Sequence, residues 1–139
     1  MQQDQITGYS EKLQIEKRYV TVTTKETLLE MVEAIEEASR ISLDTETTSL
    51  NPRKGKIIGF SITTKIGTGF YLPTLKWNNY TQKLEELLIE GKSTHNIAVR
   101  VMKMLKGKKL ICHNASFDLR YIKNYYGVSL IEDLWVDTA

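Results

Sequence analysis

The stretch ISLDTETTSL at residues 41–50 places two carboxylates, Asp44 and Glu46, one residue apart in a run that otherwise predicts a β-strand. Side chains alternate between the two faces of a strand, so both acids point the same way, about 7 Å apart at the backbone. Two like charges at this spacing raise each other's pKa unless a cation neutralises them. The pair is therefore a candidate site for a hard ion such as Mg²⁺, which prefers carboxylate and water oxygens.

The same spacing is common on strands that bind nothing, so a further acid is needed to favour a metal site. Asp118, in HNASFDLRYI, is that candidate, because strand ends and helix starts form the ligand crevice of α/β sheets. Each residue also has a structural alternative: Asp118 complements a helix dipole, and Asn114 is a favoured cap residue. We exclude a zinc site at His113, since only His95 and Cys112 could add nitrogen or sulfur ligands.

The hydrophobic pattern predicts alternating strands and helices around these acids. The predicted strands cover residues 18–23, 40–44, 56–64, 67–73, 108–114 and 132–139, and the predicted helices cover 24–39, 81–90, 94–107 and 116–127. A capping box of Thr23 and Glu26 begins the first helix, and Gly91 closes the second. The turn KIGTG makes 56–64 and 67–73 an antiparallel hairpin. These elements predict an α/β domain with a mixed sheet, in which helices cover the faces of the sheet.

The composition is that of one globular domain. The chain has 139 residues, 41% of them hydrophobic and 26% charged. It contains no run of about 18 apolar residues, and its first residues lack the apolar core of a signal peptide. The single cysteine excludes an internal disulfide, so we expect a cytoplasmic protein. We interpret residues 1–18 as a polar tail or linker and 19–139 as the domain.

The formal net charge of the chain, +2, is too small to indicate a nucleic-acid-binding protein by itself. Two groups of basic residues could still form patches, although solvated faces are the simpler interpretation. They are Arg53, Lys54, Lys56 and Lys65, and Lys103, Lys106, Lys108 and Lys109.

DTETTSL followed by HNASFD resembles the first two motifs of the DnaQ-like (DEDD) 3′–5′ exonucleases, which share an RNase H-like fold. The similarity extends from about Tyr19 to Ala139. It is strongest to the proofreading exonuclease domain of family A DNA polymerases, through YVTVTTKETL, IIGFSITT, GFYLP and DLWVDTA. The expected fold is therefore an RNase H-like mixed sheet flanked by helices.

The resemblance implies hydrolysis of the 3′-terminal phosphodiester of single-stranded DNA, with release of nucleoside monophosphates. Such enzymes use two Mg²⁺ or Mn²⁺ ions, which need several carboxylates converging from different elements. By the resemblance, Asp44 bridges both ions, Glu46 completes the site that activates water, and Asp118 holds the second ion through water molecules.

The substrate-binding residues implied in the same way are Thr45, Thr47, Leu50, Asn114 and Phe117. Thr47 and Leu50 match positions that contact the terminal base, with Leu50 as an apolar wedge. Such stacking is worth about 1–3 kcal/mol per base and tolerates any sequence. For Leu50 and Phe117, ordinary core packing is an equal alternative.

The sequence departs from the family at a third motif, an aspartate preceded four residues earlier by a tyrosine or histidine. The sequence ends 21 residues after Asp118 without it, so the general base is unknown. We do not assign Asp137 as a metal ligand.

We expect a C-terminally truncated exonuclease domain, part of a longer polymerase or exonuclease, with little activity alone. A short protein completed by another chain is the alternative, and the incomplete sheet could also form a dimer.

Two other functions remain open from the sequence. One is a non-catalytic RNase H-like module that binds nucleic acid or serves as a scaffold. The other is an RNA-trimming exonuclease of the same superfamily, because nothing in the sequence recognises the 2′-hydroxyl of ribose. The preference for DNA rests on the polymerase-like segments alone.

Overall fold

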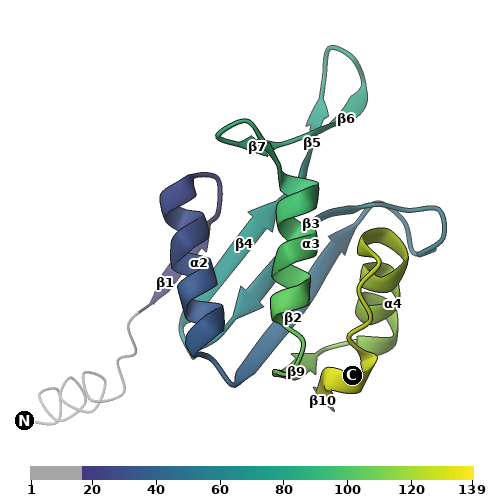
Figure 1. Cartoon of the computed structure of the whole chain (residues 1–139). Coiled ribbons are helices and arrows are strands. Elements are labelled where there is room, and N and C mark those ends of the chain that lie inside the picture. Colours follow the sequence, from purple (N-terminus) through teal and green to yellow (C-terminus); the bar gives the residue numbers. More distant parts are fainter. Residues whose placement is uncertain (1–16) are drawn as a thin grey trace, which may run out of the picture.

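The computed structural model describes residues 17–139, so the predicted tail lies outside the described part except at its last two positions. A six-stranded sheet forms the centre of the domain (Figure 1), in the order β1-β4-β3-β2-β9-β10. Its strands are β1 (Arg18–Thr21), β2 (Arg40–Thr47), β3 (Ile57–Thr63), β4 (Thr68–Pro73), β9 (Lys109–Cys112) and β10 (Leu134–Asp137).

The sheet is mixed, as the sequence predicts. β3 is antiparallel to β2 on one side and to β4 on the other, so the predicted hairpin is confirmed. β1 lies parallel to β4, and β9 lies parallel to both β2 and β10. The three parallel strands β2, β9 and β10 therefore end at the same edge of the sheet, where an α/β protein builds its crevice.

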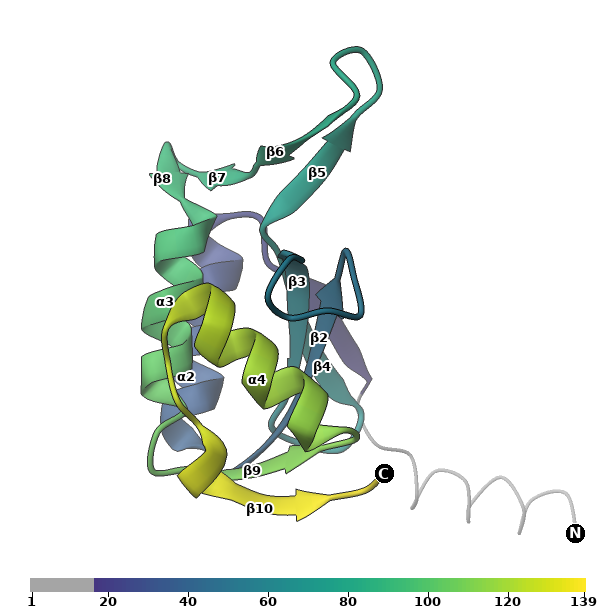
Figure 2. The same cartoon turned by 90° about the vertical axis from the view of Figure 1, so that its right-hand side faces the viewer.

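The helices are α2 (Lys25–Glu37), α3 (Thr94–Met104) and α4 (Ala115–Tyr126), and all three lie on one side of the sheet (Figures 1 and 2). Alternate strand residues such as Leu43 and Phe60 are buried beneath them, and the Phe60 ring packs edge-on against Tyr126 of α4. The opposite face carries Ser61 and Thr63, which are half-buried. The expectation of helices on both faces is thus wrong for the part of the chain that the structure describes.

The predicted helix at residues 81–90 is wrong. These residues form β6 (Lys83–Glu86), antiparallel to β5 (Leu75–Asn78), and β7 (Leu88–Ile89), antiparallel to β8 (Lys92–Ser93). Glu90 and Gly91 both have positive φ, 49° and 76°, which suits a tight hairpin turn rather than a helix end. The β5–β6 ribbon projects beyond the end of the central sheet (Figure 2).

The helix boundaries differ slightly from the prediction. α2 is capped one residue later than expected: Thr24 Oγ1 accepts from the Thr27 N–H at 3.1 Å, and Thr27 Oγ1 accepts from the Thr24 N–H at 3.1 Å. A hydroxyl thus fills the reciprocal position that the sequence assigned to Glu26. α4 ends at Gly127 as predicted, with φ of 74°. A 3₁₀ turn, η1 (Ile131–Asp133), precedes β10. Within residues 17–139, no helix is both long enough and apolar enough to cross a membrane.

Candidate active site

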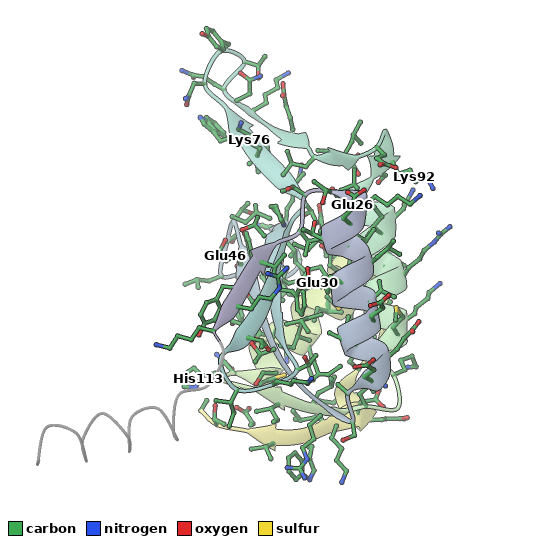
Figure 3. The ribbon with its side chains drawn as sticks, turned by 90° about the vertical axis from the view of Figure 1, so that its left-hand side faces the viewer. Glu26, Glu30, Glu46, Lys76, Lys92 and His113 are labelled. Atoms are coloured by element: carbon green, nitrogen blue, oxygen red, sulfur yellow. The ribbon has the colours of Figure 1, made fainter. Side chains whose placement is uncertain are left out.

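β2 places its two acids on the face of the sheet that the helices leave uncovered. Ile41 and Leu43 are buried on the helix side, whereas Asp44 and Glu46 are exposed. Figure 3 shows Glu46 on the side of the sheet that faces away from α2. The strand alternation expected from the sequence is therefore present.

Asp118 reaches the edge of β2 from the first turn of α4. β9 pairs with β2 only as far as Ser42, so the next part of this edge has no strand partner there. Asp118 occupies the gap: its Oδ1 accepts from the Thr45 hydroxyl at 2.5 Å and from the Thr45 N–H at 3.3 Å. Thr45 separates Asp44 from Glu46. The structure therefore brings the third acid to the residue between the other two.

The electrostatic environment of Asp118 reflects this position. Its side chain is 3% exposed. Burial raises the pKa of its carboxyl group, the hydrogen bonds from Thr45 oppose that shift, and the carboxylates of Asp44 and Asp137 add to it. A neighbouring cation would lower this pKa again, because a positive charge stabilises the ionised carboxylate.

Glu46 is held by a tyrosine that lies two strands away. The Tyr71 hydroxyl, on β4, donates to Glu46 Oε2 at 2.7 Å. The intervening strand allows this contact because Gly59 is paired with Glu46, and a Cβ on Gly59 would lie 2.3 Å from the Tyr71 hydroxyl oxygen. Burial, followed by the interaction with Glu46, raises the pKa of Tyr71, so the phenol stays a proton donor.

The donors suit a hard divalent cation in kind, since all three are carboxylates. The Asp44 carboxylate is exposed and accepts no hydrogen bond from the described residues, whereas those of Glu46 and Asp118 each accept one from a hydroxyl. Among residues 17–139, no three His, Cys, Asp or Glu side chains are grouped closely enough to hold a metal ion. The site therefore offers ligands of the right chemistry without a complete ligand set.

A groove of about 280 Å³ lies beside Asp44 on the uncovered face. Its lining combines the apolar residues Leu43, Ile111 and Cys112 with the polar residues Ser42, Asp44, Ser61, Thr63, His113 and Thr138. The His113 ring is exposed, and its Nδ1 lies 3.1 Å from the Thr138 hydroxyl. His113 and Glu46 lie on the same side of the sheet (Figure 3).

The substrate-binding candidates fall into different environments. Thr47 donates to the Ser49 carbonyl at 3.2 Å. Leu50 is 88% exposed and so does not pack in the core. Phe117 is half-buried and packs on Tyr121, with ring centroids 5.2 Å apart.

Asn114 is exposed at the N-cap of α4, where its side chain makes no capping hydrogen bond. Asp137 supplies that bond instead, because its Oδ2 accepts from the Ala115 N–H at 3.1 Å. Asp137, which the sequence left unassigned, therefore caps the helix that carries Asp118.

The first of the two basic groups that the sequence allowed is divided in the structure. Arg53, Lys54 and Lys56 lie in the loop between β2 and β3, but Lys65 lies beyond the other end of β3. The second group includes residues with structural contacts. Lys106 and Lys108 donate to backbone carbonyls, and Lys109 lies over the Trp135 ring.

Sequence reasoning missed Tyr71 and Tyr121. Gly59, in the middle of a strand, signals close approach of another group and could have suggested a side chain crossing β3. Tyr121 follows Asp118 by three positions, so the two share a face of α4. Neither signal identifies the atom that the tyrosine contacts.

Residues 19–135 match a family model described as 3′–5′ exonuclease. DNA polymerase I of Borreliella burgdorferi (strain ATCC 35210 / DSM 4680 / CIP 102532 / B31) is 33% identical over 110 residues. The matched segment is 77% of this chain but 11% of that polymerase, so the chain spans about a tenth of the relative.

Solved structures with the same fold include two proteins of Trypanosoma brucei. One is RNase D in complex with RNA U12, with a TM-score of 0.58, 18% identity and coverage of 81% of this chain and 35% of that chain. The other is the catalytic core of RRP6, with a TM-score of 0.53, 18% identity and coverage of 85% and 28%. They confirm the expected α/β, RNase H-like fold.

Proposed function

Because the chain belongs to the 3′–5′ exonuclease family, we propose that it binds the 3′ end of single-stranded DNA and presents Asp44, Glu46 and Asp118 to the terminal phosphodiester. The observation that carries this proposal is the pair of hydrogen bonds from Thr45 to Asp118. They bring the acid of α4 to Thr45, the residue of β2 that separates Asp44 from Glu46. In the proposed context, the chain is the proofreading domain of a DNA polymerase I-like protein.

Divalent cations, Mg²⁺ or Mn²⁺, would be held by Asp44 and Glu46 from β2 and by Asp118 from α4. When bound, two such ions stabilise the attacking and leaving oxygens of the phosphodiester. Thr45 orients Asp118 by occupying Oδ1, and Tyr71 orients Glu46 by donating to Oε2. These hydroxyls have the role that second-shell groups have in metal sites generally.

The substrate would lie across the uncovered face and the loop after β2. Leu50 is exposed at this loop and can pack on the terminal base, an interaction that tolerates any base. Arg53, Lys54 and Lys56 follow in the same loop, where their charges can neutralise phosphates. Thr47 and Asn114 are further substrate contacts within this proposal, and Phe117 supports the cleft from α4.

Cleavage by these 139 residues alone is expected to be slow. The motivation is that the described residues contain no group of three metal-binding side chains, and no general base is assigned. Completing the site would need further groups, for which the much longer polymerase relative offers one source and a second chain another.

A non-catalytic nucleic-acid-binding module is the second candidate. It is favoured by the same missing ligand group and by the hydroxyl partners that Glu46 and Asp118 already have. An RNA-trimming activity is tested alongside, because RNase D, crystallised with RNA, has the same fold.

One assay separates these candidates. Purified protein is incubated with a 3′-labelled 12-nucleotide DNA or the matching RNA, in Mn²⁺ or Mg²⁺, beside Asp44→Asn and the exposed-surface control Glu33→Gln. Slow release of labelled mononucleotide from DNA, lost in Asp44→Asn and retained in Glu33→Gln, supports the proposal. Binding without release identifies the non-catalytic module, and faster release from RNA identifies RNA trimming. Neither binding nor release contradicts all three.

A further inference from the structure

The Tyr121 hydroxyl is buried against the backbone of the loop between β2 and β3. The side chain, on α4, is 0% exposed. Its O–H donates to the Ser49 carbonyl, and the Asn51 carbonyl lies 3.2 Å from the same oxygen. A phenol has one proton to donate, so the two carbonyls share it. Leu50 is the residue between them.

The loop is shaped to receive this hydroxyl. A Cβ on Gly55 would lie 1.7 Å from the Tyr121 hydroxyl oxygen and 3.0 Å from Ser49 Cβ, so a side chain there would displace the tyrosine. The Ser49 carbonyl also accepts from the Thr47 hydroxyl at 3.2 Å. The backbone on both sides of Leu50 is therefore tied to fixed elements, to β2 through Thr47 and to α4 through Tyr121.

The Leu50 side chain takes no part in the contacts that hold the loop. It is 88% exposed, whereas the tyrosine that holds its flanking carbonyls is fully buried. An exposed leucine whose own backbone is anchored at both neighbours is a rigid apolar projection, and rigidity lowers the entropic cost of packing a base on it. Tyr121 also lies one helical turn after Asp118, so α4 fixes both the third acid and the loop.

We propose that Tyr121 is a positioning residue, which with Gly55 fixes the loop at residues 48–56 so that Leu50 meets the terminal base of a bound strand. The inference rests on the proposed function for its ligand. The fixing of the loop is a property of the protein alone and can be measured without nucleic acid.

The first measurement is limited trypsin digestion of native protein. Arg53, Lys54 and Lys56 are cleavage sites inside the loop, and Lys76 and Lys83 on the β5–β6 ribbon are internal references. Tyr121→Phe is expected to raise cleavage in the loop about fivefold, the effect of losing one hydrogen bond of ordinary net strength. Cleavage at the ribbon stays constant. Tyr125→Phe, on the same helix, is the control and changes neither.

The second measurement is binding of a 3′-terminal base. Fluorescence anisotropy compares a DNA oligonucleotide with one that is abasic at its 3′ residue, and the ratio of the two affinities reports contact with the base. Leu50→Ala, on an exposed residue, is expected to lower this ratio about fivefold. Tyr121→Phe lowers it similarly, and the double variant is no worse than Leu50→Ala.

The outcomes distinguish the two proposals. Unchanged loop cleavage in Tyr121→Phe overturns the positioning role, whatever the DNA result. Faster loop cleavage with an unchanged base ratio overturns the link between the loop and the base. If the wild-type protein binds no DNA, the proposed function fails while the digestion still decides whether Tyr121 fixes the loop. Thermal melting of each variant shows whether a change is global.

Discussion

Asp118 Oδ1 accepts hydrogen bonds from both the hydroxyl and the backbone N–H of Thr45. An acid at the start of α4 is thereby tied to the residue that separates the two acids of β2, although Thr45 and Asp118 are 73 positions apart in the sequence. The contact is possible because β9 stops pairing with β2 at Ser42 and leaves the edge of the strand open. The position of the Asp118 carboxylate relative to β2 depends on this contact.

Replacing Thr45 tests that dependence. Thr45→Val keeps the shape of the side chain but removes the hydroxyl, so buried Asp118 loses its shorter hydrogen bond. We expect the free energy of unfolding to fall by about 1–2 kcal/mol, measured by urea denaturation at pH 7. Thr45→Ser retains a hydroxyl and should lose less. Equal losses in the two variants would show that the hydroxyl does not hold Asp118.

Gly59 is predicted to be required for the Tyr71–Glu46 contact. In Gly59→Ala the new Cβ would lie 2.3 Å from the Tyr71 hydroxyl oxygen, so the tyrosine must leave Glu46. Overpacking of this kind costs about 1–3 kcal/mol of unfolding free energy, which denaturation can measure.

Tyr71→Phe supplies the control for this prediction, because it removes the oxygen nearest to the new methyl group. The cost of Gly59→Ala should be smaller in a Tyr71→Phe background than in the wild type. Simple addition of the two costs would mean that the glycine is needed for another reason.

The Cys112 thiol is expected to be unreactive in the folded protein. It is 1% exposed. Burial, reinforced by the negative charges of Asp118, Asp137 and Asp44, raises the pKa of the thiol from 9.0 to about 11. At pH 8 the group is therefore neutral, and a thiol-disulfide reagent should modify it only at the rate at which the protein unfolds.

The same shift gives a pH dependence of stability. The unfolded thiol ionises near pH 9, whereas the folded thiol keeps its proton until about pH 11. The contribution of Cys112 to stability is thus complete below pH 9 and is lost as the pH rises toward 11. Cys112→Ala should show a smaller decline over this range. Rapid modification of native protein at pH 8 would contradict the buried, protonated thiol.

Much of the fold follows from periodicity in the sequence. The alternation in ISLDTE placed Asp44 and Glu46 on one face of β2, and the structure has them there. The 3.6-residue pattern and Gly127 defined α4, which carries Asp118. These features are local, because a strand face or a helix end is decided by residues a few positions apart.

Other features depend on contacts that local patterns do not contain. The segment at 81–90 fits a helical stripe, but pairing of β6 with β5 and the Glu90–Gly91 turn make it a ribbon. Tyr71 reaches Glu46 across a third strand, and Tyr121 reaches a loop 72 positions away. Tertiary pairing decides each of these.

Direct titration with Mn²⁺, followed by electron paramagnetic resonance, is the measurement closest to the central claim that Asp44, Glu46 and Asp118 together hold divalent cations. We expect the wild-type protein to bind Mn²⁺, and Asp44→Asn, Glu46→Gln and Asp118→Asn each to weaken binding at least about tenfold. Glu33→Gln, an exposed acid on α2, should bind as the wild type does. If the three variants bind Mn²⁺ as tightly as the wild type, the acids do not form the site.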